Sequence, residues 1–156
     1  MGIALTLLQY LDDRHIDYDT LVHGFSETAM KNAEAAHIPG ERLVKAVILK
    51  DDTGYLMAVL PATRHIDFPT LKQALDRDVE MVEEDDLTTM FDDCDIGAIP
   101  PVGIAYGLQT IVEDLVPTHG DIYFEAGDHK TMIHLKAGAY DRLMAGAPHE
   151  RFSFVE

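Results

Sequence analysis

The 156-residue sequence contains one cysteine, no tryptophan and only 12 lysine and arginine residues against 28 aspartate and glutamate residues. A single cysteine, Cys94, can form no internal disulfide and cannot supply the paired thiolates of a structural zinc site. A disulfide-stapled secreted domain and a zinc finger are therefore excluded, and we expect a cytoplasmic protein. The formal net charge of -16 argues against DNA binding and broad RNA binding, because Lys and Arg supply most of that affinity.

Long apolar runs and standard catalytic signatures are also missing. No stretch approaches the roughly 18 to 20 apolar residues that span a bilayer, so we expect no membrane contact. A Gly-x-Ser-x-Gly elbow, a Walker loop, His-Glu-x-x-His and Gly-x-Gly-x-x-Gly do not occur. Among eight histidines, His129 and His134 are the closest late pair. Their spacing within a strand would place them on opposite faces, so we expect no metal and no cofactor.

What is present fits one globular domain. An apolar content of 47% is enough for one core, and the length leaves room for a single domain, residues 1–156. Periodicity and capping predict helices at 3–13, from Ser26 to Ala36, after Asp67, and at 137–144. Alternation predicts strands at 18–22, 43–50, 55–60, 109–112, 122–125 and 131–135, with a hairpin turn at 51–54. We therefore predict an α+β fold with a mixed, mostly antiparallel sheet and helices packed around it.

The stretch from Asp76 to Asp95 holds ten acidic residues and one basic residue, Arg77. Apolar residues recur within it, which favours a short strand and an acidic-faced helix over an acidic interaction tail. Cys94 lies among three of these aspartates, whose charge raises the pKa of a thiol, so we expect it to be inert.

Lys45 interrupts the apolar run 43–49. Strand alternation can point it to solvent, or its stem can snorkel while its ammonium pairs with a carboxylate. It can also be a fixed cation in a cleft, placed to hold a phosphate or an ester oxygen.

Residues 97–103, which we term the Gly-Pro loop, are apolar and stiffened by Pro100 and Pro101. The amides of Gly97, Ala98, Ile99, Val102 and Gly103 remain to donate hydrogen bonds. Such a loop can hold developing charge on an ester carbonyl, as an oxyanion hole does. A tight structural crossing explains the glycines equally well.

Five segments stand in a specific order along nearly the whole chain: Ala33-Glu34-Ala35-Ala36, Leu43-Val44-Lys45-Ala46-Val47, Ala58-Val59-Leu60-Pro61, the Gly-Pro loop, and Phe124-Glu125-Ala126-Gly127-Asp128-His129. In this order they resemble the YbaK-like aminoacyl-tRNA deacylases, which are related to the editing domain of bacterial prolyl-tRNA synthetases. No single segment is specific; the ordered combination is.

The resemblance implies hydrolysis of a mischarged aminoacyl ester at the 3′ end of a tRNA, with water as the acyl acceptor. Its functional lysine and Gly-x-x-x-Pro loop fall on Lys45, Gly97 and Pro101, the implied catalytic residues. The implied substrate-binding residues are Ala98, Ile99, Val102, Gly103 and His129. His129 fits a purely structural turn equally well. The family works largely by positioning, so a missing triad and a missing metal are expected under this resemblance.

The implied partner is the 3′ aminoacyl-adenosine end of a mischarged tRNA, and an aminoacyl-tRNA synthetase is a further candidate partner. A monomer is slightly favoured. The negative charge of the chain repels tRNA at long range. Six cations are candidates for a compensating surface: Lys31, Arg42, Lys45, Lys50, Arg64 and Lys130.

The sequence departs from the commonest family pattern at two places. Ala46 stands where many relatives have Thr, and Ile99-Pro100 stands where many have a Ser before the proline. The loss of these two hydroxyls leaves the identity of the amino acid open. The resemblance implies a small residue such as alanine, serine, proline or cysteine, and the sequence does not distinguish among them. The alternative function is a catalytically silent module that keeps the pocket and binds a small ligand or a partner. A basic surface leading to Lys45 would favour the deacylase, and an acidic rim would favour the module.

Overall fold

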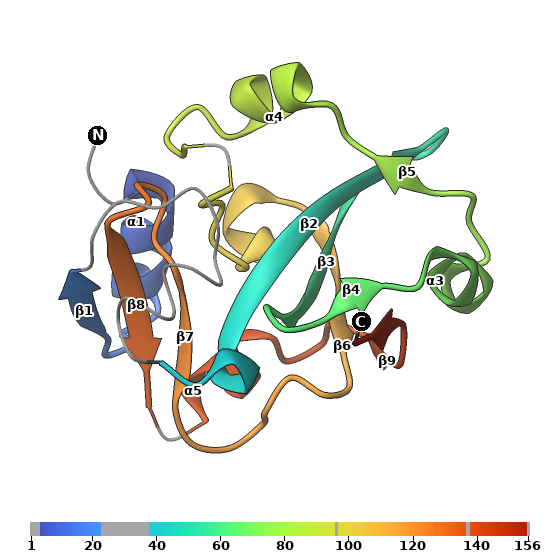
Figure 1. The fold of residues 1–156 in the computed structure, drawn as a ribbon. Helices are drawn as coiled ribbons and strands as arrows, with labels where there is room; N and C mark the ends of the chain where they lie inside the picture. The colour runs from blue at the N-terminus through green and yellow to red at the C-terminus, as the bar shows by residue number, and fades with distance from the viewer. Residues whose placement is uncertain (1–3, 23–37, 96, 137, 156) are drawn as a thin grey trace.

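The computed structural model describes residues 4–22, 38–95, 97–136 and 138–155, and Figure 1 traces their course. The helix expected from Ser26 to Ala36 lies outside the described residues. So do Ile3 and Ala137, which open two other expected helices.

An eight-stranded mixed sheet organises the described part of the chain, in the order β1-β8-β7-β2-β3-β6-β9, with β5 paired to β2. The strands are β1 (Asp19–Val22), β2 (Leu43–Asp51), β3 (Gly54–Pro61), β5 (Glu80–Met81), β6 (Gln109–Glu113), β7 (Ile122–Glu125), β8 (Thr131–Leu135) and β9 (His149–Glu150). The pairs β1/β8, β7/β8, β2/β3 and β2/β5 are antiparallel. The pairs β2/β7, β3/β6 and β6/β9 are parallel. The prediction of a mixed, mostly antiparallel sheet is confirmed.

The β2–β3 hairpin forms where its turn residues predict it. The Oδ1 atom of Asp51 accepts the N–H of Thr53 at 2.9 Å, and Gly54 adopts a φ of +136°, which residues with a side chain rarely adopt. Arg77 clamps this turn from outside, with Nε 2.6 Å from Oδ2 of Asp51. Hydrogen bonds from the guanidinium hold the pKa of Asp51 well below its usual range.

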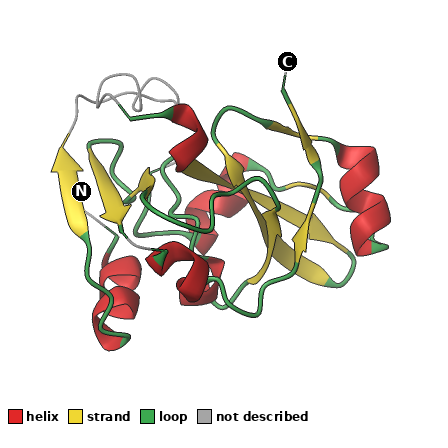
Figure 2. Ribbon diagram, turned by 90° about the horizontal axis from the view of Figure 1, so that it is seen from below, coloured by secondary structure: helices red, strands yellow, loops and turns green. Residues whose placement is uncertain are grey.

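Helices cover both faces of the sheet. Val44 and Ile48 belong to the main apolar cluster, to which α1 (Leu5–Asp13) and α5 (Ala139–Leu143) contribute. Leu49 and Leu60 belong to a second cluster, closed by α3 (Phe68–Leu75). Figures 1 and 2 show α1 and α3 at opposite ends of the molecule. The α+β arrangement is therefore confirmed, and none of the described helices is long and apolar enough to cross a bilayer.

The acidic stretch 76–95 is folded. It forms β5 and α4 (Glu84–Met90), whose first turn carries three acidic residues where the helix dipole favours negative charge. The apolar residues of the stretch, among them Val79, Val82 and Phe91, are buried. The prediction of a strand followed by an acidic-faced helix is confirmed.

Several short elements were not predicted. They are η1 (Gly40–Arg42), β4 (His65–Ile66), η2 (Gly103–Tyr106), β9 and β10 (Ser153–Phe154), of which β4 and β10 form a second small sheet. Two-residue strands carry too little alternation to be read from sequence. The buried Glu113 holds the C-terminal segment, since its Oε2 accepts the N–H of Phe152 at 2.8 Å.

Candidate functional site

Lys45 lies near the start of β2, opposite Leu60 of β3. Its side chain is half-buried, and burial lowers the pKa of its ammonium group. Within the described part of the chain, no carboxylate lies within ion-pair distance of its Nζ atom. In a protein with 28 acidic residues, a partly desolvated cation without such a partner is a candidate for contact with a ligand.

On the edge of β2 that does not pair with β3, the described residues provide only two short partner strands, one at each end. β7 pairs with residues 43–44, and β5 pairs with residues 49–50. Between these two strands, the Ile48 carbonyl accepts the N–H of Val82 at 3.2 Å, so the polar backbone groups of Ile48 point to this edge. Residues two apart in a strand point their backbone groups to the same edge, so those of Ala46 face it as well. Figure 1 shows the yellow segment after α4, which carries the Gly-Pro loop, on this side of β2.

The Gly-Pro loop is held rigidly from α5. Pro100 and Pro101 are buried, and the hydroxyl of Tyr140 donates to the Pro101 carbonyl at 2.6 Å. Burial raises the pKa of Tyr140 far above its usual value, so the hydroxyl remains a donor. Gly97 is exposed and adopts a φ of +84°, a conformation that favours glycine.

Two of the five loop amides are consumed within the chain. The N–H of Ala98 donates to Asp95 O at 3.1 Å, and the N–H of Val102 donates to Pro100 O at 2.8 Å. The expectation that all five amides are available is wrong for these two, because the loop folds into two tight turns. The amides of Gly97 and Ile99 have no acceptor among the described residues.

Gly103 serves close packing. A Cβ at this position would overlap Oγ1 of Thr110 and lie 3.2 Å from Sδ of Met57. Only glycine lets η2 approach β6 and β3 this closely. For Gly103, the interpretation as a glycine required by a tight structural crossing is therefore the correct one.

The turn between β7 and β8 contains His129, which is buried and has a φ of +58°. Oδ1 of Asp128 accepts the N–H groups of Lys130 at 2.9 Å and Thr131 at 2.8 Å. The expectation that His129 shares a strand with His134 is wrong, because this turn ends before β8 begins and only His134 lies in the strand. Among the described residues, no three His, Cys, Asp or Glu side chains are grouped to hold a metal ion.

This turn is joined to two other segments. The N–H of Asp95 donates to Gly127 O at 2.7 Å, and the N–H of Ala4 donates to Ala126 O at 2.8 Å. Asp128 carried no predicted role. The sequence did contain a signal for this turn. An aspartate in a Gly-Asp segment commonly accepts hydrogen bonds from the backbone two or three residues later, and here Thr131 stands at the third position.

The side chains of Lys45 and of the Gly-Pro loop lie on opposite faces of β2. Lys45 shares its face with Leu49, whereas Ile99 and Val102 pack against the main cluster on the other face. The candidate site therefore combines the Lys45 side chain, the edge of β2 at Ala46, which has no partner strand among the described residues, and the amides of Gly97 and Ile99, whose loop lies on this side of β2 (Figure 1).

Cys94 belongs to a polar network in the segment that follows α4. Its Sγ atom lies 3.3 Å from Oδ1 of Asp93 and 3.3 Å from the Tyr106 hydroxyl. Burial raises the pKa of the thiol to about 12, and the neighbouring aspartates act in the same direction. The inert thiol is therefore supported, but burial is the main cause and the acidic neighbours are secondary.

The six candidate cations differ in their surroundings. Arg42 donates to the carbonyls of His119 and Asp121 at 3.0 and 2.8 Å, and Arg64 donates to Ser153 O at 2.9 Å. Both guanidinium groups thus hold backbone in place. The remaining four are Lys45 and Lys50, half-buried in β2, Lys130, exposed in the turn after β7, and Lys31, which lies outside the described residues.

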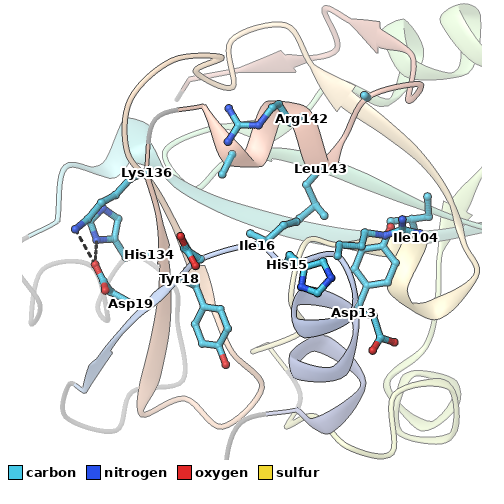
Figure 3. Close-up of a pocket in the computed structure, with 15 residues that line it drawn as sticks. Asp13, His15, Ile16, Tyr18, Asp19, Ile104, His134, Lys136, Arg142 and Leu143 are labelled. Atoms are coloured by element: carbon cyan, nitrogen blue, oxygen red, sulfur yellow. Dashed lines mark ion pairs between the residues drawn. The ribbon is translucent and has the colours of Figure 1, made fainter.

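A polar groove of about 920 Å³ is lined by none of the candidate cations that the structure describes and by no residue of the Gly-Pro loop. The connection from α1 to β1, the end of β8, and α5 bound it (Figure 3). On one wall Asp19 lies 3.0 Å from Lys136 and 3.5 Å from His134. Its lining balances three basic side chains against three acidic ones: Arg14, Lys136 and Arg142, and Asp13, Asp17 and Asp19.

Comparison with known proteins identifies the relatives of this chain. The family model of the aminoacyl-tRNA editing domain matches residues 23–143. The proline–tRNA ligase of Fervidobacterium nodosum is 33% identical over 91 residues, which cover 58% of this chain and 16% of the ligase. The matched segment is thus a small part of that ligase.

Two solved structures share the fold. A candidate trans-editing enzyme for prolyl tRNA synthetase superimposes with a TM-score of 0.81 at 15% identity, covering 97% of this chain and 96% of that one. A candidate signal transduction protein from Marinobacter aquaeolei VT8 gives a TM-score of 0.77 at 21% identity, covering 99% of this chain and 31% of that one.

Proposed function

The chain belongs to the aminoacyl-tRNA editing domain family, and from this premise we propose that it is a trans-editing deacylase for tRNA mischarged with a small amino acid. The observation that carries the proposal is Lys45. It is a half-buried cation whose pKa burial lowers, and no carboxylate of the described residues lies within ion-pair distance. Such a group gains most by binding an oxygen of a ligand.

The proposed reaction needs no side-chain nucleophile. Water attacks the carbonyl carbon of the ester, the bond to the 3′ oxygen of the terminal ribose breaks, and that oxygen takes up a proton. The products are a free amino acid and an uncharged tRNA. Negative charge develops on the carbonyl oxygen in the transition state, where a preorganised N–H donor typically contributes about 10² to 10³ in rate.

Each site residue has a proposed role. The Lys45 ammonium contacts a phosphate or ester oxygen as a point charge, and the amides of Gly97 and Ile99 face the carbonyl oxygen. Pro101 keeps the loop rigid, because its carbonyl accepts a hydrogen bond from the Tyr140 hydroxyl. Ala98, Val102 and Gly103 shape the pocket, and His129 contacts the substrate from the adjacent turn.

The proposed partner is the 3′ aminoacyl-adenosine end of the tRNA, with a synthetase as the source of the mischarged substrate. A relative of the chain is itself a proline–tRNA ligase, and a structural neighbour is a candidate trans-editing enzyme for prolyl tRNA synthetase. Translation would place this activity in the cytoplasm.

The test is hydrolysis of tRNAs charged with alanine, serine, proline or cysteine by the wild type and by Lys45→Ala. We expect Lys45→Ala to lower kcat/KM by about 10- to 100-fold, as for loss of a hydrogen bond to a charged group. Lys72→Ala is the matched control, because Lys72 pairs with Asp78 at the surface and should leave the rate unchanged. A folded wild type that hydrolyses none of these esters would contradict the proposal.

The second candidate is a binding module, and the groove of Figure 3 favours it. Its balanced charges suit a small ligand that carries both signs better than a phosphate chain. A module would show no ester hydrolysis, while a free amino acid would raise its melting temperature and Arg142→Ala would weaken that effect. Hydrolysis without such a shift excludes this alternative.

A further inference from the structure

Asp128 is a buried carboxylate, 6% exposed, to which the proposed chemistry gives no task. Oδ1 accepts the N–H groups of Lys130 and Thr131, and Oδ2 accepts the Thr131 hydroxyl at 3.1 Å. We propose that Asp128 is a positioning residue that sets the place of the Gly97 and Ile99 amides. This inference rests on the proposed deacylase function and deepens it.

The turn that contains Asp128 is linked to the loop by two successive backbone hydrogen bonds. The carboxylate fixes the turn that contains Gly127, whose carbonyl accepts the N–H of Asp95 at 2.7 Å. The Asp95 carbonyl in turn accepts the N–H of Ala98 at 3.1 Å. Because Ala98 lies between Gly97 and Ile99, the position of this turn sets where both neighbouring amides point.

The turn cannot shift easily, because its other side is closed. Gly127 adopts a φ of +110°, and a Cβ there would lie 3.0 Å from Cβ of Ala4. Ala4 also donates its N–H to Ala126 O. His129 has a left-handed φ of +58°, which is unfavourable for a residue with a side chain, so the surrounding hydrogen bonds must offset this strain.

Removal of the carboxylate would leave the part-buried amide of Lys130 and the buried amide of Thr131 without this acceptor. The turn would then relax toward ordinary backbone angles and take the Gly127 carbonyl with it. Donors that act on developing charge influence the transition state more than the bound substrate. Displaced amides should therefore lower kcat and leave KM nearly unchanged.

The test compares Asp128→Ala, Asp128→Asn and Asp67→Ala. Asparagine keeps an oxygen that can accept both amides, so Asp128→Asn should retain kcat within about threefold, whereas Asp128→Ala should lose about 10- to 100-fold. Asp67 is the matched control: it caps α3 by accepting the N–H of Thr70 at 3.3 Å and lies outside the candidate site. Asp67→Ala should lower stability and leave the kcat of the folded protein unchanged.

A second measurement reads the position of the loop without activity. Backbone amide chemical shifts of Gly97 and Ile99 should move in Asp128→Ala and stay in place in Asp67→Ala. Unmoved shifts would overturn the positioning role, even if the wild type proved inactive. Inactivity of the wild type with moved shifts would count against the deacylase function alone.

A double-mutant cycle separates the loop from His129, which shares the turn. If Asp128 acts on the loop, Asp128→Ala should still lower kcat in a His129→Ala background. No further loss in that background would mean that Asp128 acts through His129, and it would overturn the inference.

Discussion

Burial has opposite functional consequences for Lys45 and Cys94. It lowers the pKa of the lysine ammonium, and no carboxylate of the described residues compensates for the lost water, so the cation gains by contact with a ligand. It raises the pKa of the cysteine thiol to about 12 and keeps the sulfur protonated. One physical cause therefore makes Lys45 a candidate contact and removes Cys94 from the candidate nucleophiles.

We expect Cys94 to react slowly with iodoacetamide in the folded protein at neutral pH. A rise of the pKa from 9.0 to about 12 lowers the thiolate fraction on the order of 10³-fold relative to the unfolded chain. The measurement is the alkylation rate with and without denaturant. Since the folded-state pKa is raised, the unfolded chain loses this proton first, and the contribution of Cys94 to stability should fall as the pH rises above 9.0 toward about 12.

The control for this prediction is Cys94→Ser. A serine hydroxyl can replace the contacts to Asp93 and Tyr106, so the variant should keep the hydrolytic activity of the wild type. Rapid alkylation of the native protein together with loss of activity would show instead that Cys94 is a reactive group.

At the scale of elements, the predictable parts are those whose cause is local. The hairpin follows from the turn residues 51–54, and α3 follows from Asp67 as its cap, because both depend on neighbours in the sequence. The strands β4 and β10 pair across a long separation, and two residues each give no pattern to read.

The candidate site was predictable in composition and not in geometry. Lys45 and the Gly-Pro loop stand out as exceptions to the patterns around them. Which loop amides stay free depends on the carbonyls of Asp95 and Pro100, which only the folded loop brings into reach. The role of Gly103 likewise depends on Thr110, a residue of another element.

We expect Gly103→Ala to lower the free energy of unfolding by about 1 to 3 kcal/mol, because the new methyl group overpacks the contact between η2 and β6. The Cβ would overlap Oγ1 of Thr110. The measurement is urea unfolding of the single variants and of the double variant Gly103→Ala/Thr110→Ala. Removal of the hydroxyl should relieve part of the clash, so the double variant should be more stable than the sum of the single effects implies.

Gly107→Ala is the matched control for Gly103→Ala. Gly107 has a φ of +71° and no atom within 4 Å of a built Cβ, so its substitution costs backbone strain without a clash. Its effect should add to that of Thr110→Ala. Additive behaviour of Gly103→Ala with Thr110→Ala would show that the two residues do not collide.

At the scale of the whole molecule, charge sets the terms on which RNA can bind. The net charge of -16 repels phosphate at long range, and Arg42 and Arg64 are engaged with backbone carbonyls. Of the candidate cations that the structure describes, this leaves Lys45, Lys50 and Lys130. An editing site needs only the end of the tRNA, so a small local contact can suffice where a broad basic surface is absent.

The salt dependence of hydrolysis should therefore be weak. Each phosphate neutralised on a single strand contributes about -0.7 to the slope of log K against log salt, so two or three contacts give a slope no steeper than about -2. Screening of the long-range repulsion by salt acts in the opposite direction and flattens the slope further. The measurement is kcat/KM for a mischarged tRNA between low and moderate salt, with the corresponding aminoacyl-adenosine ester as the phosphate-free control. The ester should show almost no salt dependence. A slope steeper than about -5 for the tRNA would require an extended basic interface and would contradict contact with the terminal nucleotides alone.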